Sequence, residues 1–309
     1  MRSFEFRKLK GIQRSCGMKN RVFEISPRLK WLEGSSEGRA WLGDLPSRVQ
    51  ACADLWELRL DPPYAEAYVS LVLPGTRSDK TPVVLKLQFP HSESAYEAEG
   101  LKCWNGQGTV RLFAYELRYH ALLMEKCEPG SPLSGVGPDE ALETLAELLP
   151  RLWIEADKPF VSLCEESAKW AEHLPSCWER AGRPFEMKLL DSALQAIHSL
   201  RESQGQQVLI NQDLHGDNVL RAKREPWLVI DPKPLTGERE FSIAPIVRSY
   251  EFGHSQKATV DRLNRLTNAL GLNRERARLW AFAQTLAWSF EFERALDRHV
   301  QTARWLCHA

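Results

Sequence analysis

The chain has 309 residues, of which 43% are hydrophobic and 27% are charged, and its 41 basic and 41 acidic residues give no net charge. This composition excludes a disordered protein, and the balanced charge excludes a global attraction to nucleic acid or to an anionic membrane. The length predicts two lobes that share a cleft rather than one compact domain.

Residues 1–17 are basic, show little hydrophobic periodicity and end just before Met18. They are predicted to form a mobile extension outside the folded core. Between residues 26 and 58 the apolar residues recur at intervals of three and four, which predicts two short helices. Pro27 and Pro46 stand where these helices would begin, because proline is favoured in the first helical turn.

The next part of the chain is rich in strand signals. Four segments show alternation and β-branched content, namely residues 67–73, 82–89, 109–116 and 119–126. The turn-like "PGTRSDKT" between the first two predicts a hairpin, and residues 92–104 have helical spacing. Residues 18–125 are therefore predicted to form an amino-terminal lobe with a small mixed β-sheet and one helix.

A Gly-, Pro- and Ser-rich stretch, residues 126–137, is predicted to be a hinge. Residues 138–309 form the predicted carboxy-terminal lobe, whose first helix begins near Pro138. One strand pair and four further helices are expected there, the helices over residues 165–173, 186–203, 257–270 and 273–296. The expected fold class is α+β, with a small sheet lobe and a larger, mainly helical lobe.

The stretch "NQDLHGDNVL", residues 211–220, places short polar side chains directly before a strand. The strand pair that follows has its turn centred between Arg224 and Glu225, which predicts that Asn218 lies opposite Asp231. Their oxygen atoms suit Mg²⁺, which takes few protein ligands and leaves its other positions to water and phosphate. The spacing also fits D-L-x-x-x-N, a pattern in which the aspartate, here Asp213, accepts a hydroxyl proton.

A site that handles phosphate also needs a cation from the other lobe. Strand alternation directs Lys86 away from the face that Val83 and Leu85 share. Glu97 follows eleven residues later on the predicted helix and is the expected ion-pair partner of Lys86. In the alternative interpretation, Glu97 completes a capping box with Ser94.

These residues carry a resemblance that covers most of the chain. Lys86, Glu97, "MEKCEPG", "DLHGDN" and "IDPKPLTGEREFSIAPIVR" resemble the aminoglycoside phosphotransferase family, specifically its streptomycin and hydroxyurea phosphotransferase branch. The resemblance implies a protein-kinase-like fold, with the amino-terminal lobe as the nucleotide-binding lobe. It also implies ATP and Mg²⁺ as cosubstrates and phosphorylation of a hydroxyl group on an antibiotic-like or sugar-like acceptor, with a role in antibiotic resistance.

The same resemblance implies a role for each matching residue. Asp213 is the catalytic carboxylate, and Asn218 and Asp231 bind magnesium. Lys86 contacts phosphate, Glu97 orients Lys86, and the backbone from Glu125 to Cys127 meets adenine. Cys127 itself is predicted to be a small apolar hinge residue rather than a reactive thiol.

The chain departs from the family pattern at several positions. Asn211 stands where the family usually has a histidine that supports the loop, and Ser242 stands where an aspartate is usual. Asp217 replaces a glycine and is predicted to be a turn residue. The phosphate-covering loop, "LDPPYAEAYVS", has no glycine, although glycine eases a close approach of backbone to phosphate. Asp213, Asn218, Asp231 and Lys86 are intact, which favours a competent site with altered support.

Two other functions stay open on the residues alone. The departures also fit a nucleotide-binding protein of the same fold that is catalytically impaired. An unrelated hypothesis takes "DLHGD" as part of a metal-dependent hydrolase, but the other histidines show no paired spacing that would complete its metal site.

Several side chains near the motif keep two interpretations. His215 either braces the loop through a bond to backbone or acts in catalysis, and Lys233 is either a surface charge or a phosphate contact. The aromatic residues between 280 and 292 are predicted to be mostly core. A cationic acceptor would require carboxylates on the carboxy-terminal side of the cleft, for which the candidates are Glu165, Glu166, Glu291 and Glu293.

The seven cysteines are odd in number and form no C-x-x-C pair, which predicts free thiols and a cytoplasmic location. No run of about 18 apolar residues occurs, so no membrane span is expected. Nothing in the sequence indicates a protein partner, and a small-molecule acceptor is the partner that the motifs predict.

Overall fold

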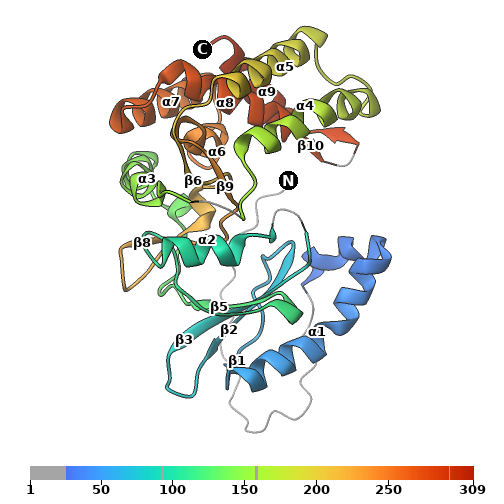
Figure 1. Cartoon of the computed structure of the whole chain (residues 1–309), viewed down its shortest axis with the longest axis vertical. Helices are drawn as coiled ribbons and strands as arrows, with labels where there is room; N and C mark the ends of the chain where they lie inside the picture. The colour runs from blue at the N-terminus through green and yellow to red at the C-terminus, as the bar shows by residue number, and fades with distance from the viewer. Residues whose placement is uncertain (1–25, 92–93, 157–158, 292) are drawn as a thin grey trace.

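The amino-terminal lobe is built on a five-stranded antiparallel sheet with the order β1-β2-β3-β5-β4 (Figure 1). The computed structural model describes residues 26–309 except 92–93, 157–158 and 292, so the expectation for residues 1–17 lies outside the described part. The strands are β1 Arg59–Leu60, β2 Ser70–Thr76, β3 Pro82–Gln88, β4 Leu112–Glu116 and β5 Ala121–Glu125. The predicted β2–β3 hairpin is confirmed, with Val72 paired to Lys86.

The alternation of side chains along β3 decides what covers each face of the sheet. Val83 is fully buried, and Leu85 and Leu87 pack with the 3-10 helix η1 Pro27–Gly34 and with α1 Ser36–Leu55. Lys86 points the other way, toward α2 Glu97–Trp104, as predicted. Lys86 is therefore on the face of the sheet that α2 covers, and α2 lies between the sheet and the carboxy-terminal lobe (Figure 1).

The helix start predicted at Pro27 is confirmed, but the one predicted at Pro46 is wrong. Pro46 lies inside the 20-residue helix α1, which is capped by Ser35, whose side chain accepts a hydrogen bond from the Gly38 N–H. Proline removes one backbone donor from the helix interior. Burial compensates, because one face of α1 packs on the sheet on both sides of the proline, through Leu42, Leu45, Val49 and Cys52.

The carboxy-terminal lobe surrounds the buried helix α8 Arg274–Ala287, where Trp280 and Phe282 belong to the core as predicted. The other helices are α3 Pro138–Leu152, α4 Leu163–Arg180, α5 Met187–Glu202, α6 Ala244–Arg248, α7 Gln256–Leu270 and α9 Asp297–Cys307. None of the helices in the described part of the chain combines the length and apolar character that crossing a bilayer requires.

The single helix predicted over residues 273–296 is wrong. α8 ends at Ala287, a short hairpin follows with β10 Phe290–Glu291 and β11 Arg294–Ala295, and α9 begins at Asp297. Ser289 explains the break, because its buried hydroxyl donates to the Leu286 carbonyl and competes with the helical hydrogen-bond pattern.

In the described part of the lobe, two strand pairs lie among these helices besides the β10–β11 hairpin, although the sequence predicted only one pair. β7 Val219–Arg221 pairs with β8 Trp227–Val229, as expected, and β6 Gln207–Asn211 pairs with β9 Pro234–Glu238. Short 3-10 helices occupy Leu117–Tyr119, Leu133–Gly135, Gly216–Asn218 and Arg239–Ile243. Both strand pairs converge on the stretch that carries Asp213.

Candidate active site

Asn211, at the end of β6, organises the loop that carries Asp213. Its side chain is buried, and its Oδ1 accepts the Asp213 N–H at 3.1 Å and the Lys233 N–H at 2.9 Å. The Gln212 N–H donates to the Lys233 carbonyl at 3.0 Å. Asn211 thus connects the loop of Asp213 to the segment after Asp231. In this chain Asn211 supports the loop at the position where the family usually has a histidine.

The predicted register of the β7–β8 hairpin is wrong by one residue. Val219 pairs with Val229, and the Ile230 N–H donates to the Asn218 carbonyl at 2.9 Å, so Ile230 rather than Asp231 lies opposite Asn218. The strand pattern does not continue to Asp231, whose φ of 49° is left-handed. This turn sends the Asp231 side chain out of the ladder and toward Lys86.

The side chains of Asn218 and Asp231 suit a hard cation. Asn218 Nδ2 donates to the Asp213 carbonyl at 3.1 Å, so its amide oxygen is the atom left for a metal. The Asp231 carboxylate supplies negative charge, and its side chain is 52% exposed. One amide oxygen and one carboxylate fit Mg²⁺ in a site that substrate phosphates complete.

Lys86 joins the two lobes at this point. Its Nζ lies 2.6 Å from Glu97 Oε2 and 2.6 Å from Asp231 Oδ1. Burial lowers the pKa of Lys86, but the charges of Asp231 and Glu97 outweigh burial and raise it, so the ammonium stays charged. Burial raises the pKa of the Glu97 carboxyl to about 7 against the attraction of Lys86.

The alternative role for Glu97, a capping box with Ser94, does not form. The Ser94 hydroxyl donates to the carbonyls of Phe89 and His91, and α2 has no side-chain cap. Glu97 Oε2 also accepts from Gln88 Nε2 at 2.5 Å. The Glu97 carboxylate therefore binds two side chains of β3, Lys86 and Gln88, instead of capping its own helix.

Two cations that the sequence did not single out as a pair hold the Asp213 carboxylate. Lys233 Nζ lies 3.1 Å from Asp213 Oδ2, and Arg248 Nη2 lies 3.3 Å from Asp213 Oδ1. Both cations lie over the Trp288 ring, with the Arg248 Cζ at 4.5 Å and the Lys233 Nζ at 5.4 Å from its centroid. Arg248 closes the stretch "IDPKPLTGEREFSIAPIVR", and Trp288 belongs to the aromatic residues predicted to be core. Neither was assigned to Asp213, because they lie 35 and 75 positions beyond it and no local spacing relates them.

His215 braces the loop, but through a carboxylate rather than through backbone. Its Nδ1 lies 2.7 Å from Glu251 Oε1, while Glu251 Oε2 accepts the Gly216 N–H at 2.7 Å. The hydrogen bond to Glu251 and the charge of Asp213 outweigh burial and raise the pKa of His215. A Cβ at Gly216 would lie 2.6 Å from the Phe252 ring, so this close approach requires glycine at position 216 rather than at 217.

His215, Asp217 and Glu251 could in principle group around a transition metal. Each is already engaged, since His215 pairs with Glu251 and Asp217 accepts a hydrogen bond from the Ser134 hydroxyl. Among the described residues no other such group of His, Cys, Asp and Glu occurs. The arrangement therefore fits a braced loop better than the hydrolase metal site.

The hinge region after β5 is shaped by Glu125 and Cys127. Cys127 is buried beside Met124 and Leu228, and burial raises the pKa of its thiol to about 12, as expected for an apolar hinge residue. The Glu125 N–H donates to the Arg111 carbonyl at 2.9 Å. The Cys127 N–H donates to no acceptor within the described part of the chain, which leaves it for a ligand.

The candidate carboxylates for a cationic acceptor are partly used elsewhere. Glu165 forms a capping box with Ser162 at the start of α4, and Glu166 pairs with Lys169. Glu291 lies opposite Arg294 in the β10–β11 hairpin. Ser242, in contrast, keeps a buried anchor, since its hydroxyl donates to the Arg239 carbonyl at 2.6 Å and accepts from Trp153 Nε1 at 3.1 Å.

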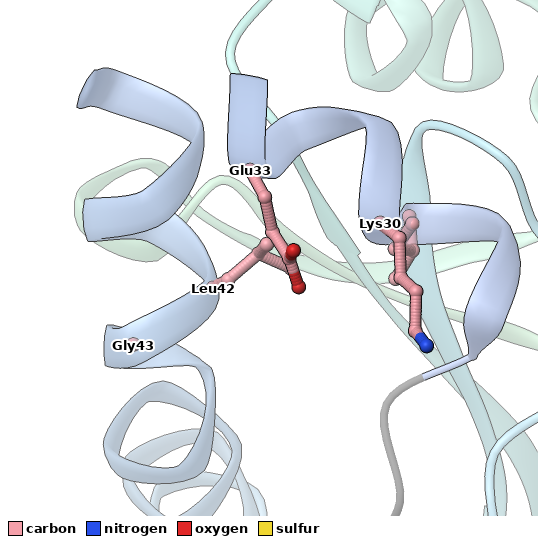
Figure 2. Close-up of a pocket in the computed structure, with 5 residues that line it drawn as sticks. Lys30, Glu33, Leu42 and Gly43 are labelled. Atoms are coloured by element: carbon pink, nitrogen blue, oxygen red, sulfur yellow. The ribbon is translucent and has the colours of Figure 1, made fainter. Parts of the chain in front are cut away.

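A hollow of about 280 Å³ lies between η1 and α1 and is lined by Leu29, Lys30, Glu33, Leu42 and Gly43 (Figure 2). Lys30 and Glu33 are exposed, and both helices cover the face of the sheet opposite Lys86. This hollow is therefore separate from the residues that converge on Asp213.

Comparison with known proteins decides the family. The family of aminoglycoside/hydroxyurea antibiotic resistance kinases matches residues 55–294. The chain belongs to this family. A streptomycin 6-kinase from Streptomyces glaucescens is 37% identical over 257 residues, which cover 81% of this chain and 83% of that protein. A hydroxyurea phosphotransferase from Kitasatospora aureofaciens is 35% identical over 266 residues, 84% of this chain and 77% of that protein.

Solved structures agree with this antibiotic resistance kinase family at the level of the fold. Choline kinase LicA from Streptococcus pneumoniae has a TM-score of 0.61 at 11% identity, covering 84% of this chain and 97% of that one. A spectinomycin phosphotransferase in complex with ADP and spectinomycin has a TM-score of 0.52 at 13% identity. The match covers 83% of this chain and 93% of that one. The predicted kinase-like fold and family are confirmed, and the chain is a phosphotransferase that acts on a hydroxyl group.

Proposed function

We propose that the chain transfers the γ-phosphoryl group of ATP, with Mg²⁺, to a hydroxyl group of a small antibiotic-like acceptor. The observation that carries the proposal is the double contact of Lys86 with Glu97 and Asp231. It connects a strand of the sheet lobe to a carboxylate 145 positions away, beside the loop that holds Asp213. Lysine, glutamate and metal-binding aspartate in this relation are the parts that phosphoryl transfer in kinases needs.

Each side chain has a distinct task in the reaction. Asp213 accepts the acceptor's hydroxyl proton as the hydroxyl oxygen bonds to the γ-phosphorus. The bond from that phosphorus to the bridging oxygen breaks, and its electron pair leaves on ADP. Lys86 holds the phosphates of the nucleotide, and Glu97 holds Lys86.

Asn218 and Asp231 would hold Mg²⁺, which neutralises charge on the nucleotide phosphates when it is bound. Their donor atoms suit this ion because both are hard oxygens, one neutral and one charged. Asn218 is oriented by its own hydrogen bond to the Asp213 carbonyl. The same bond therefore links the metal ligand to the catalytic carboxylate.

The hinge would hold adenine through the backbone from Glu125 to Cys127. The Cys127 N–H is the donor that supports this assignment, since within the described part of the chain no acceptor takes it. The Glu125 side chain has another task, because both of its oxygens accept from Arg224. Adenine recognition would thus rely on backbone atoms.

Streptomycin and hydroxyurea, the substrates in the names of the two relatives, are the first acceptors to test. Spectinomycin, which is bound in the spectinomycin phosphotransferase of similar fold, is the third acceptor to test. The capping box of Glu165 and the ion pair of Glu166 support an acceptor that is not recognised by a dense acidic lining. We also propose a cytoplasmic location, because the reaction consumes ATP and the described cysteines form no disulfide.

The test is Asp213→Asn, assayed with ATP, Mg²⁺ and the three acceptors. Because catalysis here is mostly positioning and electrostatics, kcat should fall by ~10²–10⁴-fold while ATP affinity changes little. Asp191→Asn, at an exposed position on α5, is the matched control and should retain full turnover. Turnover within a few-fold of the unmutated protein in Asp213→Asn would contradict the assignment, and ATP binding without turnover of any acceptor would favour the impaired alternative.

A further inference from the structure

Lys233 has a backbone that is fixed on both sides. Its N–H donates to Asn211 Oδ1 at 2.9 Å, and its carbonyl accepts from the Gln212 N–H at 3.0 Å. It also follows Asp231 by only two residues. The base of the side chain therefore cannot move relative to either the proposed metal carboxylate or the loop of Asp213.

The Lys233 side chain reaches the Asp213 carboxylate. Its Nζ lies 3.1 Å from Asp213 Oδ2 and over the Trp288 ring, and 25% of the side chain is exposed. The second cation on Asp213 is more confined. The Arg248 side chain is 11% exposed, stacks on Trp288 at 4.5 Å and lies 3.4 Å from His299 Nε2.

The first part of the loop between β1 and β2, residues 61–64, leaves no backbone N–H for a phosphate. Pro62 and Pro63 have no backbone N–H, while the Asp61 N–H donates to the Pro74 carbonyl and the Tyr64 N–H donates to the Val72 carbonyl. Four successive residues of this glycine-free loop thus offer no backbone donor to a phosphate. Charge that develops on the transferring group must be met by other donors.

We infer that Lys233 is a further catalytic residue, which contacts the γ-phosphoryl group as it is transferred. The inference rests on the proposed function. Without nucleotide the ammonium group neutralises Asp213. With ATP bound, it turns from Asp213 to the γ-phosphoryl oxygens and keeps its proton, while Arg248 stays on Asp213 and the acceptor hydroxyl approaches the released carboxylate oxygen.

The experiment separates contact with the γ-phosphate from a structural role. Calorimetry with Mg²⁺ measures the affinities of ADP and of a non-hydrolysable ATP analogue for the unmutated protein, Lys233→Met and Lys233→Arg. In Lys233→Met, ADP affinity should stay within about two-fold, analogue affinity should fall about ten-fold or more, and acceptor turnover should fall about 10²-fold. Lys233→Arg should recover most of the preference for the analogue, because it restores the charge.

The matched control is Lys188→Met, at an exposed position on α5, which should change neither affinity. Equal losses for ADP and the analogue in Lys233→Met, or no loss for either, would overturn the role of Lys233. If Lys233 is overturned while Asp213→Asn still abolishes turnover, the proposed function stands. A failure of the unmutated protein to bind any nucleotide would overturn both.

Discussion

At the scale of single residues, the loop of Asp213 is supported by Asn211 and Glu251, although the histidine that usually supports this loop in the family is absent. Asn211 Oδ1 accepts the backbone N–H groups of Asp213 and Lys233, which holds the proposed catalytic loop against the segment after Asp231. Glu251 holds the other end of the loop through His215 and Gly216. The loop is thus fixed at both ends without the usual histidine, which favours a competent enzyme over an impaired one.

Asp231→Ala tests the metal site. We expect the mutation to abolish the Mg²⁺-dependent part of ATP affinity, because Asn218 alone is a neutral ligand. Lys86 keeps Glu97 at 2.6 Å, so the variant does not leave a buried ammonium unpaired. Calorimetry with and without Mg²⁺ measures the effect, and Asp217→Ala should keep the Mg²⁺ dependence, since Asp217 bonds Ser134 instead. Equal Mg²⁺ dependence in both variants would remove Asp231 from the site.

The His215–Glu251 pair predicts a pH-dependent contribution to stability. The folded pKa of His215 is raised from 6.5, so its contribution is fully present below about pH 6.5 and is lost as pH rises through the folded value. The hydrogen bond to His215 outweighs burial and lowers the pKa of Glu251 from 4.5, so its contribution is present above about pH 4.5 and is lost at lower pH. The pair therefore stabilises most between these two values.

The measurement is the difference in melting temperature between the unmutated protein and His215→Asn, followed from about pH 5 to pH 9. The difference should be largest near pH 5–6 and should shrink as pH rises. His198→Asn, on an exposed face of α5 where the side chain is 71% exposed, is the control and should change the melting temperature little, because its pair with Glu202 is open to solvent. A His215→Asn difference that grows toward pH 9 would reverse the predicted sign.

At the scale of secondary-structure elements, the position of α2 decides whether Glu97 can reach Lys86. A Cβ at Gly100 would lie 2.9 Å from Pro234 Cγ and 3.0 Å from the Trp104 ring, so α2 packs directly on β9 of the other lobe. Trp104 Nε1 also donates to the Leu152 carbonyl at the end of α3, at 2.9 Å. These contacts hold α2 close to the carboxy-terminal lobe.

Gly100→Ala and Gly43→Ala form a matched pair of helix substitutions with opposite expected signs. Gly100→Ala should lower the free energy of unfolding by about 1–3 kcal/mol through overpacking, and should weaken ATP binding because α2 carries Glu97. Gly43, in α1, has nothing within 4 Å of an added Cβ, so Gly43→Ala should raise stability by about 0.5–1 kcal/mol. Urea unfolding measures both, and a stabilising Gly100→Ala would show that α2 can move away from Pro234.

At the scale of the whole molecule, Arg224 connects the β7–β8 turn to the sheet lobe. Its guanidinium donates to both Glu125 oxygens and to the carbonyls of Gly106 and Thr109. We propose residues 126–137 as the boundary between lobes at 18–125 and 138–309. This segment is hydrogen-bonded to β7 through its backbone. The Gly130 N–H donates to the Arg221 carbonyl, and the Arg221 N–H donates to the Ser131 carbonyl.

Arg224→Ala should lower the free energy of unfolding by about 2–3 kcal/mol, because hydrogen bonds to a charged group are lost and two carbonyls lose a donor. The Glu125 side chain is only 16% exposed and would lose its cation. Lys223→Ala, one position earlier with a 78% exposed side chain, should change stability by less than about 0.5 kcal/mol. Similar losses for the two variants in urea unfolding would show that Arg224 does not hold the lobes together.

Short spacing along the sequence was enough to predict part of the site. The alternation of β3 predicted the direction of Lys86, and the helix that follows predicted Glu97 as its partner, a contact that the structure contains. Both predictions rest on strand and helix periods, which relate near neighbours without knowledge of the rest of the chain. The five-residue interval from Asp213 to Asn218 predicts the catalytic loop in the same way and stays a prediction. The same local reasoning failed for the partner of Asn218, because the β7–β8 turn is centred on Arg224 rather than between Arg224 and Glu225, which places Ile230 opposite Asn218.

The surroundings of Asp213 and the joining of the lobes follow from packing between distant parts of the chain. Arg248 reaches Asp213 from the end of α6 across 35 positions, and the Trp288 ring lies under Arg248 and Lys233. Glu251 reaches His215 across 36 positions, and Arg224 reaches Glu125 across 99. No periodicity relates residues at such separations, because their contacts arise from how the helices pack around α8 and how α2 meets β9. The charge that surrounds Asp213, the proposed catalytic carboxylate, is therefore a property of the packed chain.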